Sequence, residues 1–483
     1  MSEEPLLISD VQARVVAELA RISPVTEELG RRFSEAGEQI ALVGGPVRDA
    51  MLGRLQNDLD FTTSARPEVT ERLVKGWADA TWDIGRAFGT IGCRRGKWQV
   101  EITTFRSEAY DAASRKPEVA YGDSLVGDLA RRDFTINSMA LSLPEQRLED
   151  PFGGILDLAH RVLRTPGRPE DSFSDDPLRM MRAARFAAQL GFTVAPEVVA
   201  AMTDMADRIS IVSAERVRDE LVKLVLAPDP VAGLRLLVET GLAAHVLPEL
   251  PALALERDEH HRHKDVYEHT LIVLEQSIDL EDRLADLTGG GPDFISRFAA
   301  LMHDVGKPKT RRFVENNVVT FHHHDVVGAK LTRRRMQALR FPKDQIDAVS
   351  QLVEQHLRFH GYGSGEWTDS AVRRYVRDAG DQLERLHVLT RADCTTRNKR
   401  KADQLRRTYD DLEARIARLS EAEELASIRP DLDGNQIMGI LGIGPGREVG
   451  EAYRHLLELR LDHGPMSEEQ ATTALLEWHA SHA

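Results

Sequence analysis

The sequence lacks the features that mark secreted and membrane proteins. Its 483 residues include only 2 cysteines, Cys93 and Cys394. Two cysteines so far apart form no disulfide framework, which favours a reducing compartment. The N-terminal residues are acidic and lack a signal-peptide pattern, and no apolar run reaches the roughly 20 residues that a membrane-spanning helix needs. We therefore expect a cytoplasmic protein without a membrane partner.

Positive charge is also scarce over the chain as a whole. The 63 Lys and Arg against 78 Asp and Glu give a net charge of −15, which argues at first against a nucleic-acid partner. The footprint of a nucleic acid is local, however, and residues 86–116 and 391–407 are both rich in Lys and Arg. Such stretches are more commonly solvated faces, so the choice between the two interpretations depends on the motifs.

The chain shows no fixed-period repeat and no low-complexity tract. Hydrophobic residues at 42% and charged residues at 29% are typical of a soluble globular protein, and the length predicts about three domains. Up to about residue 165, strand-like and helix-like segments alternate. From Ser174 onward the apolar spacing is helical and strand patterns vanish, with a turn expected at residues 430–446.

Two adjacent glycines separate a predicted strand from a predicted helix. Residues 39–43 are apolar and β-branched enough for a buried strand, and the segment from Pro46 to Leu52 begins as a helix. Glycines at such a turn let backbone N–H groups approach phosphate oxygens closely. Gly44 and Gly45 are therefore predicted to cradle phosphates.

A pair of aspartates lies on the next predicted strand, residues 58–63. Because residues two apart point the same way, Asp58 and Asp60 face one point while Leu59 and Phe61 face the core. Two carboxylates on one strand suit Mg²⁺ ions that also bind a triphosphate. An isolated pair of this kind is more commonly a solvated face of a surface strand.

Glu101 is a third acidic candidate, on the predicted strand at residues 97–105. Val100 and Ile102 share one face of that strand, and Glu101 lies on the other. It could complete a set of three carboxylates with Asp58 and Asp60, or it could be a solvated residue on an edge strand.

The motif at residues 131–137, RRDFTIN, follows an acidic loop. Arginine is a bidentate donor to phosphate, and asparagine can donate to or accept from a ribose hydroxyl. Arg132 and Asn137 therefore suit the sugar and triphosphate of a nucleotide, although so short a string also occurs by chance.

A long helix is predicted to open near Asp175, with Ser174 as its cap and Pro177 in the first turn. Asp176 and Arg179 are three residues apart and share a face. A carboxylate that accepts from an exocyclic amine, beside a guanidinium that donates to a ring nitrogen, would accept cytosine and adenine and reject guanine and uracil. The alternative is an ordinary salt bridge along the helix.

Taken together, these motifs resemble the class II CCA-adding tRNA nucleotidyltransferases and the related bacterial poly(A) polymerases of the DNA polymerase beta superfamily. The resemblance rests on GGPVRD, DLDFTT, RRDFTIN and DDPLR, and it continues through a neck-like segment to about residue 250. Asp175 stands where the family has Glu. The resemblance implies catalytic residues Asp58 and Asp60, with Mg²⁺ as their metal. It places the strand that carries the third candidate, Glu101, in the catalytic sheet without making that residue indispensable. The implied nucleotide-binding residues are Gly44, Gly45, Arg48, Arg132, Asp133, Asn137, Asp176, Arg179, Arg182 and Arg185.

The second half of the chain carries a separate set of ordered histidines and aspartates. Imidazoles and carboxylates on helices can bind one or two divalent transition metals, whereas a lone histidine is more often structural. The order resembles the HD phosphohydrolase superfamily, for which LMHDVGKP is a typical string. The implied metal ligands are His269, His303, Asp304, His324, His356 and Asp393. His322 and His323 are expected only to neighbour this site, and Lys307 or Arg358 could hold phosphate.

The two resemblances together predict the domain order. An α+β nucleotidyltransferase domain with a polymerase beta-like sheet is expected at residues 1–165. All-α neck, HD and tail domains are expected at residues 166–255, 256–400 and 401–483.

The predicted function is template-independent addition of CCA to tRNA 3′ ends from CTP and ATP, with release of pyrophosphate. The HD site is a candidate second, hydrolytic centre. The nearest alternative is a poly(A) polymerase that adds AMP only. An alternative of another class is a metal-dependent phosphohydrolase with an RNA-binding N-terminal half. A small-molecule nucleotidyltransferase fits less well, because it needs neither the base-reading helix nor the helical bulk.

Overall fold

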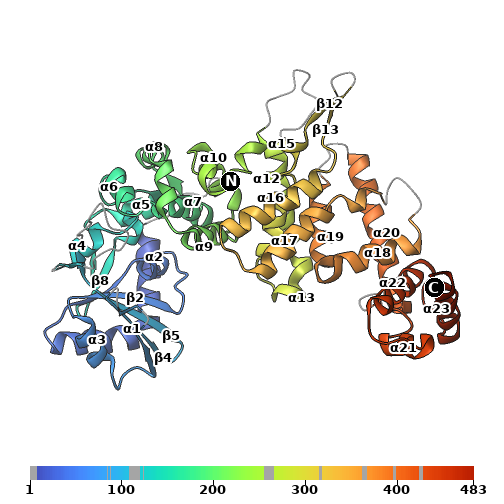
Figure 1. Cartoon of the computed structure of the whole chain (residues 1–483). Coiled ribbons are helices and arrows are strands. Elements are labelled where there is room, and N and C mark those ends of the chain that lie inside the picture. The colour runs from blue at the N-terminus through green and yellow to red at the C-terminus, as the bar shows by residue number, and fades with distance from the viewer. Residues whose placement is uncertain are drawn as a thin grey trace. The chain divides into compact units, whose positions relative to one another are not determined.

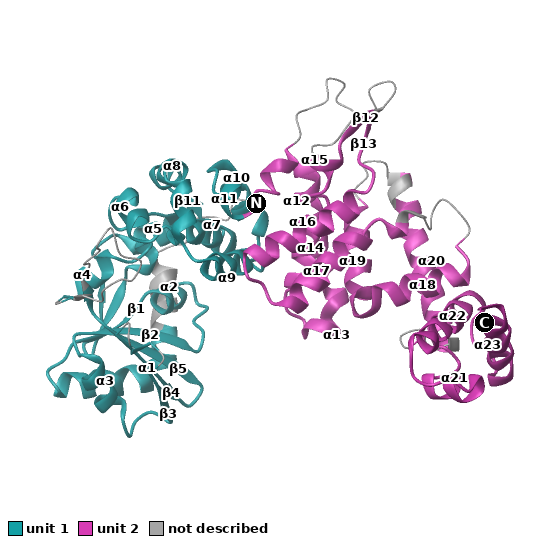
Figure 2. Ribbon diagram, viewed as in Figure 1, with its two compact units in different colours: residues 1–246 teal, residues 247–483 magenta. Residues whose placement is uncertain are grey.

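A computed structural model describes residues 8–83, 85–86, 89–107, 120–122, 124–254, 266–314, 318–361, 367–394, 399–423 and 428–482. The basic stretches at 86–116 and 391–407 lie partly outside these residues. The chain forms two compact units, Met1–Val246 and Leu247–Ala483 (Figure 2), and each is described by itself. Within the described residues, no helix is both long enough and apolar enough to cross a lipid bilayer.

Unit 1 is built on a mixed sheet of seven strands. Its spatial order is β3-β4-β5-β2-β1-β8-β9, and every neighbouring pair is antiparallel except β2 with β5. The strands are β1 Ile40–Val43, β2 Asp58–Thr63, β3 Ala80–Trp82, β4 Thr90–Arg95, β5 Trp98–Thr104, β8 Ala140–Leu143 and β9 Arg147–Glu149. The strand β1 is buried along its whole length, as expected for an apolar central strand.

Short helices and strands surround this sheet. The helix α1 (Ile8–Glu35) packs against β1 and β8 (Figure 1). The others are α2 Gly45–Met51, α3 Pro67–Val74, α4 Leu125–Ala130, the 3₁₀ helix η2 Thr135–Asn137 and α5 Gly154–His160. The two-stranded pairs are β6 Arg106–Ser107 with β7 Ala120–Tyr121, and β10 Val162–Leu163 with β11 Thr193–Val194.

The rest of unit 1 is helical and centres on α7. The helices α9 and α10 both pack against α7, and Ser213 caps α9 by accepting from the Arg216 N–H, as predicted. The elements are α6 Pro169–Asp175, α7 Leu178–Leu190, α8 Pro196–Asp204, η3 Ala206–Ile211, α9 Ala214–Val225, α10 Pro230–Glu239 and α11 Ala243–Val246.

Unit 2 consists mainly of helices. The helices α12, α14, α17 and α19 pack together, and α21, α22 and α23 form a smaller apolar cluster of their own (Figure 1). The elements of the packed region are η4 Pro251–Leu253, α12 Val266–Asp279, η5 Glu281–Leu284, α13 Ala285–Thr288, α14 Phe294–Met302, α15 Lys307–Thr310, β12 Arg312–Val314, β13 Val318–Thr320, α16 His324–Ala338, α17 Lys343–Gln355, η7 Arg358–Gly361, α18 Asp369–Ala379, η8 Gly380–Gln382 and α19 Leu383–Asp393. The last helices are α20 Lys399–Glu423, α21 Gly434–Leu441, α22 Arg447–His463 and α23 Glu468–His482.

The predicted fold class, a mixed-sheet domain followed by a predominantly helical region, is confirmed. The expectation that strands vanish after Ser174 is wrong in detail, because β11, β12 and β13 lie beyond it. Strands of two or three residues are too short for alternation to be visible in the sequence. The three boundaries between the four expected domains remain a prediction.

Two local expectations are also corrected. The expected turn at residues 430–446 contains α21, whose start is fixed by a capping box between Asp433 and Gln436. The helix expected to open near Asp175 is two helices, because Asp176 is extended before Pro177. Proline disfavours the helical conformation of the residue before it.

Candidate active site and metal centre

The three predicted catalytic carboxylates lie on two neighbouring strands. Asp58 and Asp60 project from the exposed face of β2, while the alternating residues Leu59 and Phe61 are buried, as strand alternation requires. The parallel register of β2 and β5 places Glu101 directly beside Asp60. The backbone therefore brings the Glu101 side chain to the same face of the sheet as the two aspartates.

Asp60 titrates abnormally for an aspartate. Loss of surrounding water and the nearby Glu101 carboxylate raise the pKa of Asp60 to about 6, although Arg132 acts in the opposite direction. Carboxylates gathered in this way repel one another until a cation joins them. Oxygen donors of this kind fit Mg²⁺ or a similar hard divalent ion.

A cavity of about 450 Å³ opens over these strands. Among the predicted site residues, it brings together Asp60, Glu101, Arg132, Asp133, Asp176, Arg179 and Arg182. Its other lining residues are Val43, Phe61, Thr90, Thr103, Arg106, Asp128, Arg131, Leu178 and Arg216. Gly44, Gly45, Arg48, Asn137, Arg185 and Asp58 are not among the residues that line it.

Gly44 nevertheless shapes the cavity wall. Its φ is +74°, and a Cβ atom there would lie 2.7 Å from Nη1 of Arg132. Only glycine tolerates both the backbone conformation and the close approach of the guanidinium. Arg132 is in turn paired with Asp128 at 3.2 Å. Gly44 therefore leaves the space that the Arg132 guanidinium occupies at the edge of the cavity.

Asp133 is a buried link between three elements. It accepts hydrogen bonds from Nε of Arg182 in α7 at 2.8 Å and from Nδ2 of Asn137 in η2 at 2.9 Å. Asn137 in turn accepts from Nη1 of Arg48 in α2 at 2.7 Å. Burial by itself would raise the pKa of Asp133, but Arg182 and the Asn137 hydrogen bond outweigh it and lower the pKa to about 2. This carboxylate is therefore ionised at neutral pH.

Three guanidinium groups surround the ring of Phe186. Arg48, Arg182 and Arg185 lie 5.2, 5.4 and 4.0 Å from its centroid. Arg185 is also held by Glu220 at 2.6 Å. In the structure, these three predicted nucleotide-binding arginines all contact other protein groups. Their contact with a nucleotide remains a prediction.

Asp176 and Arg179 line the same cavity but do not pair in the way that the salt-bridge alternative suggested. Asp176 accepts from the Leu178 N–H at the start of α7 at 3.1 Å and pairs with Arg216 of α9 at 2.7 Å. Arg179 donates to the hydroxyl of Ser172 at 2.8 Å. Each side chain is oriented by its own partner, so one acceptor and one donor face the cavity.

Asp128 is the most informative residue that the sequence reasoning missed. It is 3% exposed and accepts from the hydroxyl of Thr62 and from Arg132, both at 3.2 Å. It also lies 3.6 Å from Arg131. The available signal was its spacing of three and four residues before two arginines on a short helix.

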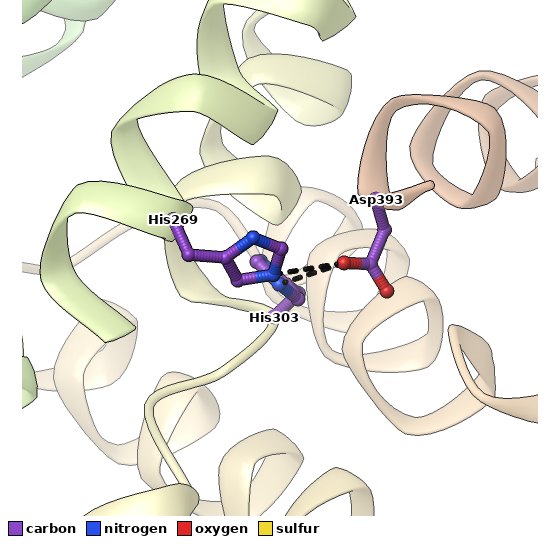
Figure 3. Close-up of side chains that lie close together, drawn as sticks. All are labelled: His269, His303 and Asp393. Atoms are coloured by element: carbon purple, nitrogen blue, oxygen red, sulfur yellow. Dashed lines mark ion pairs between the residues drawn. The ribbon is translucent and has the colours of Figure 1, made fainter. Parts of the chain in front are cut away.

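The predicted metal ligands of unit 2 come together from five helices. Figure 3 shows His269 of α12, His303 at the end of α14 and Asp393 of α19 converging on one point. A second group consists of Asp304, His324 and His356. The groups adjoin, since His269 Nε2 lies 3.0 Å from Asp393 and 3.6 Å from Asp304.

The histidine rings are oriented as metal ligands are. His303, His324 and His356 each direct Nδ1 to a backbone carbonyl at 2.6–2.8 Å. Their Nε2 atoms are buried and make no hydrogen bond in the described structure, and those of His303 and His324 each lie 3.3 Å from the Asp304 carboxylate. A carbonyl on one ring nitrogen and an open position on the other is the usual arrangement around a bound metal. The donor set of four imidazoles and two carboxylates fits divalent transition metals.

The charges around this centre also favour metal binding. Burial lowers the pKa of His356 to about 4, which keeps its ring neutral and able to coordinate. Burial opposes ionisation of Asp304, but His303 and Lys307 outweigh it and hold its pKa well below the usual range. Burial by itself would lower the pKa of His303, but the Asp304 carboxylate outweighs it and raises that pKa. The centre therefore combines a neutral imidazole at His356 with an ionised carboxylate at Asp304 at neutral pH.

The remaining predicted residues of this region lie as follows. His322 and His323 are exposed, whereas His324 is buried. This agrees with the expectation that His322 and His323 only neighbour the metal site. Lys307 donates to Asp304 at 2.5 Å, and Arg358 pairs with Asp378 at 2.5 Å. Whether Lys307 or Arg358 holds a phosphate remains a prediction.

Three family models match the chain. They are described as Poly A polymerase head domain, at residues 40–164, Probable RNA and SrmB-binding site of polymerase A, at residues 191–253, and HD domain, at residues 266–398. The first covers the sheet and its carboxylates, and the last covers the predicted metal ligands.

Similar proteins agree with these models. The chain is 35% identical to the A-adding tRNA nucleotidyltransferase of Deinococcus radiodurans over 87% of this chain and 91% of that protein. It is 43% identical to the CCA-adding enzyme of Levilactobacillus brevis, over 44% of this chain and about half (52%) of that protein. The fold resembles that of the Bacillus stearothermophilus CCA-adding enzyme in complex with CTP, with a TM-score of 0.65, 25% identity and coverage of 94% of this chain and 96% of that one.

Proposed function

The chain belongs to the family of tRNA nucleotidyltransferases that share the poly(A) polymerase head domain, and on this basis we propose that it adds CCA to the 3′ ends of tRNA from CTP and ATP. The reaction joins the 3′-hydroxyl oxygen of the RNA to the α-phosphorus of the nucleotide. The bond to pyrophosphate breaks in the same step. We place this activity in the cytoplasm.

The observation that carries the proposal is the group of Asp58, Asp60 and Glu101 beside a cavity that is also lined by arginines. These three carboxylates would hold Mg²⁺, which supplies charge neutralisation at the phosphates and activation of the attacking hydroxyl. Arg132 and its neighbours Arg131 and Arg106 would orient the triphosphate as charge-assisted donors.

The donor and acceptor at the cavity wall support a choice of base. Asp176 would accept from the exocyclic amine of cytosine or adenine, and Arg179 would donate to the adjacent ring nitrogen. Guanine and uracil present a carbonyl where that amine would be. The contacts of Asp176 with Arg216 and of Arg179 with Ser172 support this role, because they hold both groups in fixed orientations.

The test is nucleotide incorporation into tRNA that lacks its terminal CCA. CTP alone should give addition of CMP, and ATP supplied afterwards should complete the terminus. Absence of CMP incorporation would refute the proposal. Asp60→Asn should lower incorporation by at least about 100-fold, since even indirect loss of ligand support costs 10–100-fold. Glu145→Gln, at an exposed site in the same unit, should leave the rate unchanged.

Addition of AMP only is the second candidate, and one observation favours it. The relative that this chain matches over 91% of its length is named as an A-adding enzyme, whereas the match to the CCA-adding enzyme spans about half of that protein. The same assay separates the two: an enzyme that adds only A should ignore CTP and extend tRNA that already ends in CC.

For unit 2 we propose a metal centre that hydrolyses phosphoesters. The six ligands His269, His303, Asp304, His324, His356 and Asp393 would hold one or two transition-metal ions, which supply an activated water. Elemental analysis of purified protein should find a transition metal, and Asp304→Asn should remove it. The double change Asp58→Ala with Asp60→Ala should abolish nucleotide addition and leave hydrolysis intact. Loss of both activities in that variant would contradict two separate centres.

A further inference from the structure

A cationic segment leads away from the metal centre of unit 2. Residues 307–313 (KPKTRRF), here called the basic arm, contain two lysines, two arginines and no acidic residue. They form α15 and the start of β12, and the hairpin of β12 and β13 stands out from the helices of unit 2 (Figure 1). The arm departs three residues after the metal-ligand candidate Asp304, and the hairpin returns the chain to His324.

The base of the arm is fixed tightly to the metal centre. A Cβ atom at Gly306 would lie 2.0 Å from the carbonyl oxygen of His324 and 2.7 Å from the nitrogen of Gly328. Nζ of Lys307 is hydrogen-bonded to Asp304 and lies 5.8 Å from the ring centroid of Phe321, which follows the hairpin. Because no side chain fits between these backbones, the start of the arm packs directly against the segment that carries His324.

The far end of the arm exposes an aromatic ring. Phe313 is 62% exposed, the second-highest value among the large hydrophobic residues of the described structure that are exposed. The Arg311 guanidinium lies 4.9 Å from the ring centroid. Arg312 and Lys309 are exposed on the same arm, although Arg312 points to the opposite face of β12 from Phe313. An open ring flanked by cations is the arrangement by which proteins stack an unpaired base and neutralise its phosphates.

We propose that the basic arm binds single-stranded RNA and presents its phosphodiester to the adjacent metal centre. A base stacks on Phe313, and the flanking phosphates contact Arg311, Arg312 and Lys309. This inference deepens the hydrolytic function proposed for unit 2 and rests on it. An acidic peptide would satisfy the cations but would leave the ring of Phe313 without a stacking partner and the metal centre without a phosphoester.

The first test is photo-crosslinking of the full chain to a short single-stranded RNA that contains 5-iodouridine. Trypsin should release the crosslinked base on the peptide of residues 313–330. Phe313→Ala should abolish that crosslink, and Phe313→Tyr should keep it. Leu287→Ala, at another exposed apolar residue of unit 2, should have no effect. Crosslinks confined to other peptides would overturn the inference.

The second test separates stacking from charge by measuring RNA affinity against salt. Phe313→Ala should weaken binding of the short RNA about tenfold, which corresponds to one base–aromatic stack, and should leave the salt slope unchanged. Arg312→Ala should reduce the slope by about 0.7, as expected for one phosphate contact to a single strand. Arg447→Ala, at a highly exposed arginine of α22, should change neither quantity.

Wild-type affinity and salt slope in both arm variants would overturn the inference. So would sedimentation showing that Phe313→Ala abolishes self-association in the absence of RNA, because the ring would then be a contact between copies of the chain. The variants should add nucleotides to tRNA at the wild-type rate. Failure of wild-type nucleotide addition would instead refute the function proposed for unit 1.

Discussion

Gly44 combines two constraints at a single position, directly behind the cavity-lining residue Arg132. Its positive φ and the guanidinium of Arg132 at 2.7 Å from the site of a Cβ both exclude a side chain. Gly44→Ala should cost about 1–3 kcal/mol of stability and should also displace Arg132, so the KM for nucleotide should rise. Thermal unfolding and steady-state kinetics measure the two effects separately.

Gly37 provides a matched control for that substitution. Its φ is +76°, but nothing lies within 4 Å of a Cβ built there. Gly37→Ala should lower stability and leave the KM unchanged. If both variants raised the KM equally, the effect would come from backbone strain alone and Arg132 would have no part in it.

Arg216 is a residue whose contribution only the folded structure reveals. It pairs with Asp176 at 2.7 Å, yet its side chain is 54% exposed, so the pair is largely screened by solvent. Arg216→Ala should raise the KM for CTP and ATP by about two- to fivefold, as expected for an exposed ion pair. Lys223→Ala, which removes an equal charge from the same helix, should leave both values as they are.

Single residues also show what the sequence could predict. Asp58 and Asp60 were recognisable because strand alternation is a local rule, and their outward direction follows from it. Asp128, Thr90 and Arg216 join the cavity only through packing of segments that are distant in the chain. Only Asp128 carries a local signal, its spacing to Arg131 and Arg132, and no local pattern places Thr90 or Arg216 at the cavity.

At the scale of elements, hydrogen bonds of Asp133 link α7 to η2. Asn137 of η2 extends this link to α2 through its hydrogen bond with Arg48. Asp133→Asn should destabilise unit 1 by about 1–3 kcal/mol, because Arg182, which is 32% exposed and also lies 3.6 Å from Glu220, loses its closest charged partner. Denaturant unfolding followed by a probe in unit 1 measures this loss.

The same residue predicts a pH dependence of stability. The pKa of Asp133 is lowered to about 2 in the folded protein, from about 3.9 in an unfolded chain. The stabilisation is therefore complete above about pH 4 and is lost as the pH falls toward 2. In Asp133→Asn this component of the acid sensitivity should be absent, and a variant that retained it would locate the effect elsewhere.

Elements differed in how well the sequence predicted them. The strands at 40–43 and 58–63 were predicted because each is a full run of apolar or alternating residues. The helix α21 was missed because its Pro- and Gly-rich surroundings concealed the capping box at Asp433. The strands of the β12–β13 hairpin are three residues each, which is shorter than one readable period of alternation.

At the scale of the whole molecule, the two compact units should respond separately to removal of transition metal. Metal held at 100 times its Kd stabilises by about 2.7 kcal/mol, which is about 5–10 °C for a unit of this size. Treatment with 1,10-phenanthroline should lower one calorimetric transition by that amount and leave the other in place. Without any chelator, the same transition of the Asp304→Asn variant should already occur at the lower temperature. Adding the chelator should not lower it further.

The order of the units along the chain was predictable, since each carries ordered motifs of its own. The convergence of His269, His303 and Asp393 was predictable only through a family resemblance. Helical periodicity gives the face on which a ligand lies, but not which distant helix packs against that face.

The parallel pairing of β2 with β5 makes unit 1 intolerant of changes in chain length. Asp60 faces Glu101 through main-chain register, so one residue inserted in β5 before Glu101 would set Val100 opposite Asp60. Glu101 would then point to the buried face of the sheet, because a shift of one residue inverts every side chain. An insertion of two residues would preserve the alternation but would move the carboxylate along the strand by about 7 Å. Insertions and deletions in this protein should therefore be confined to its loops, and the number of residues in β5 should stay constant.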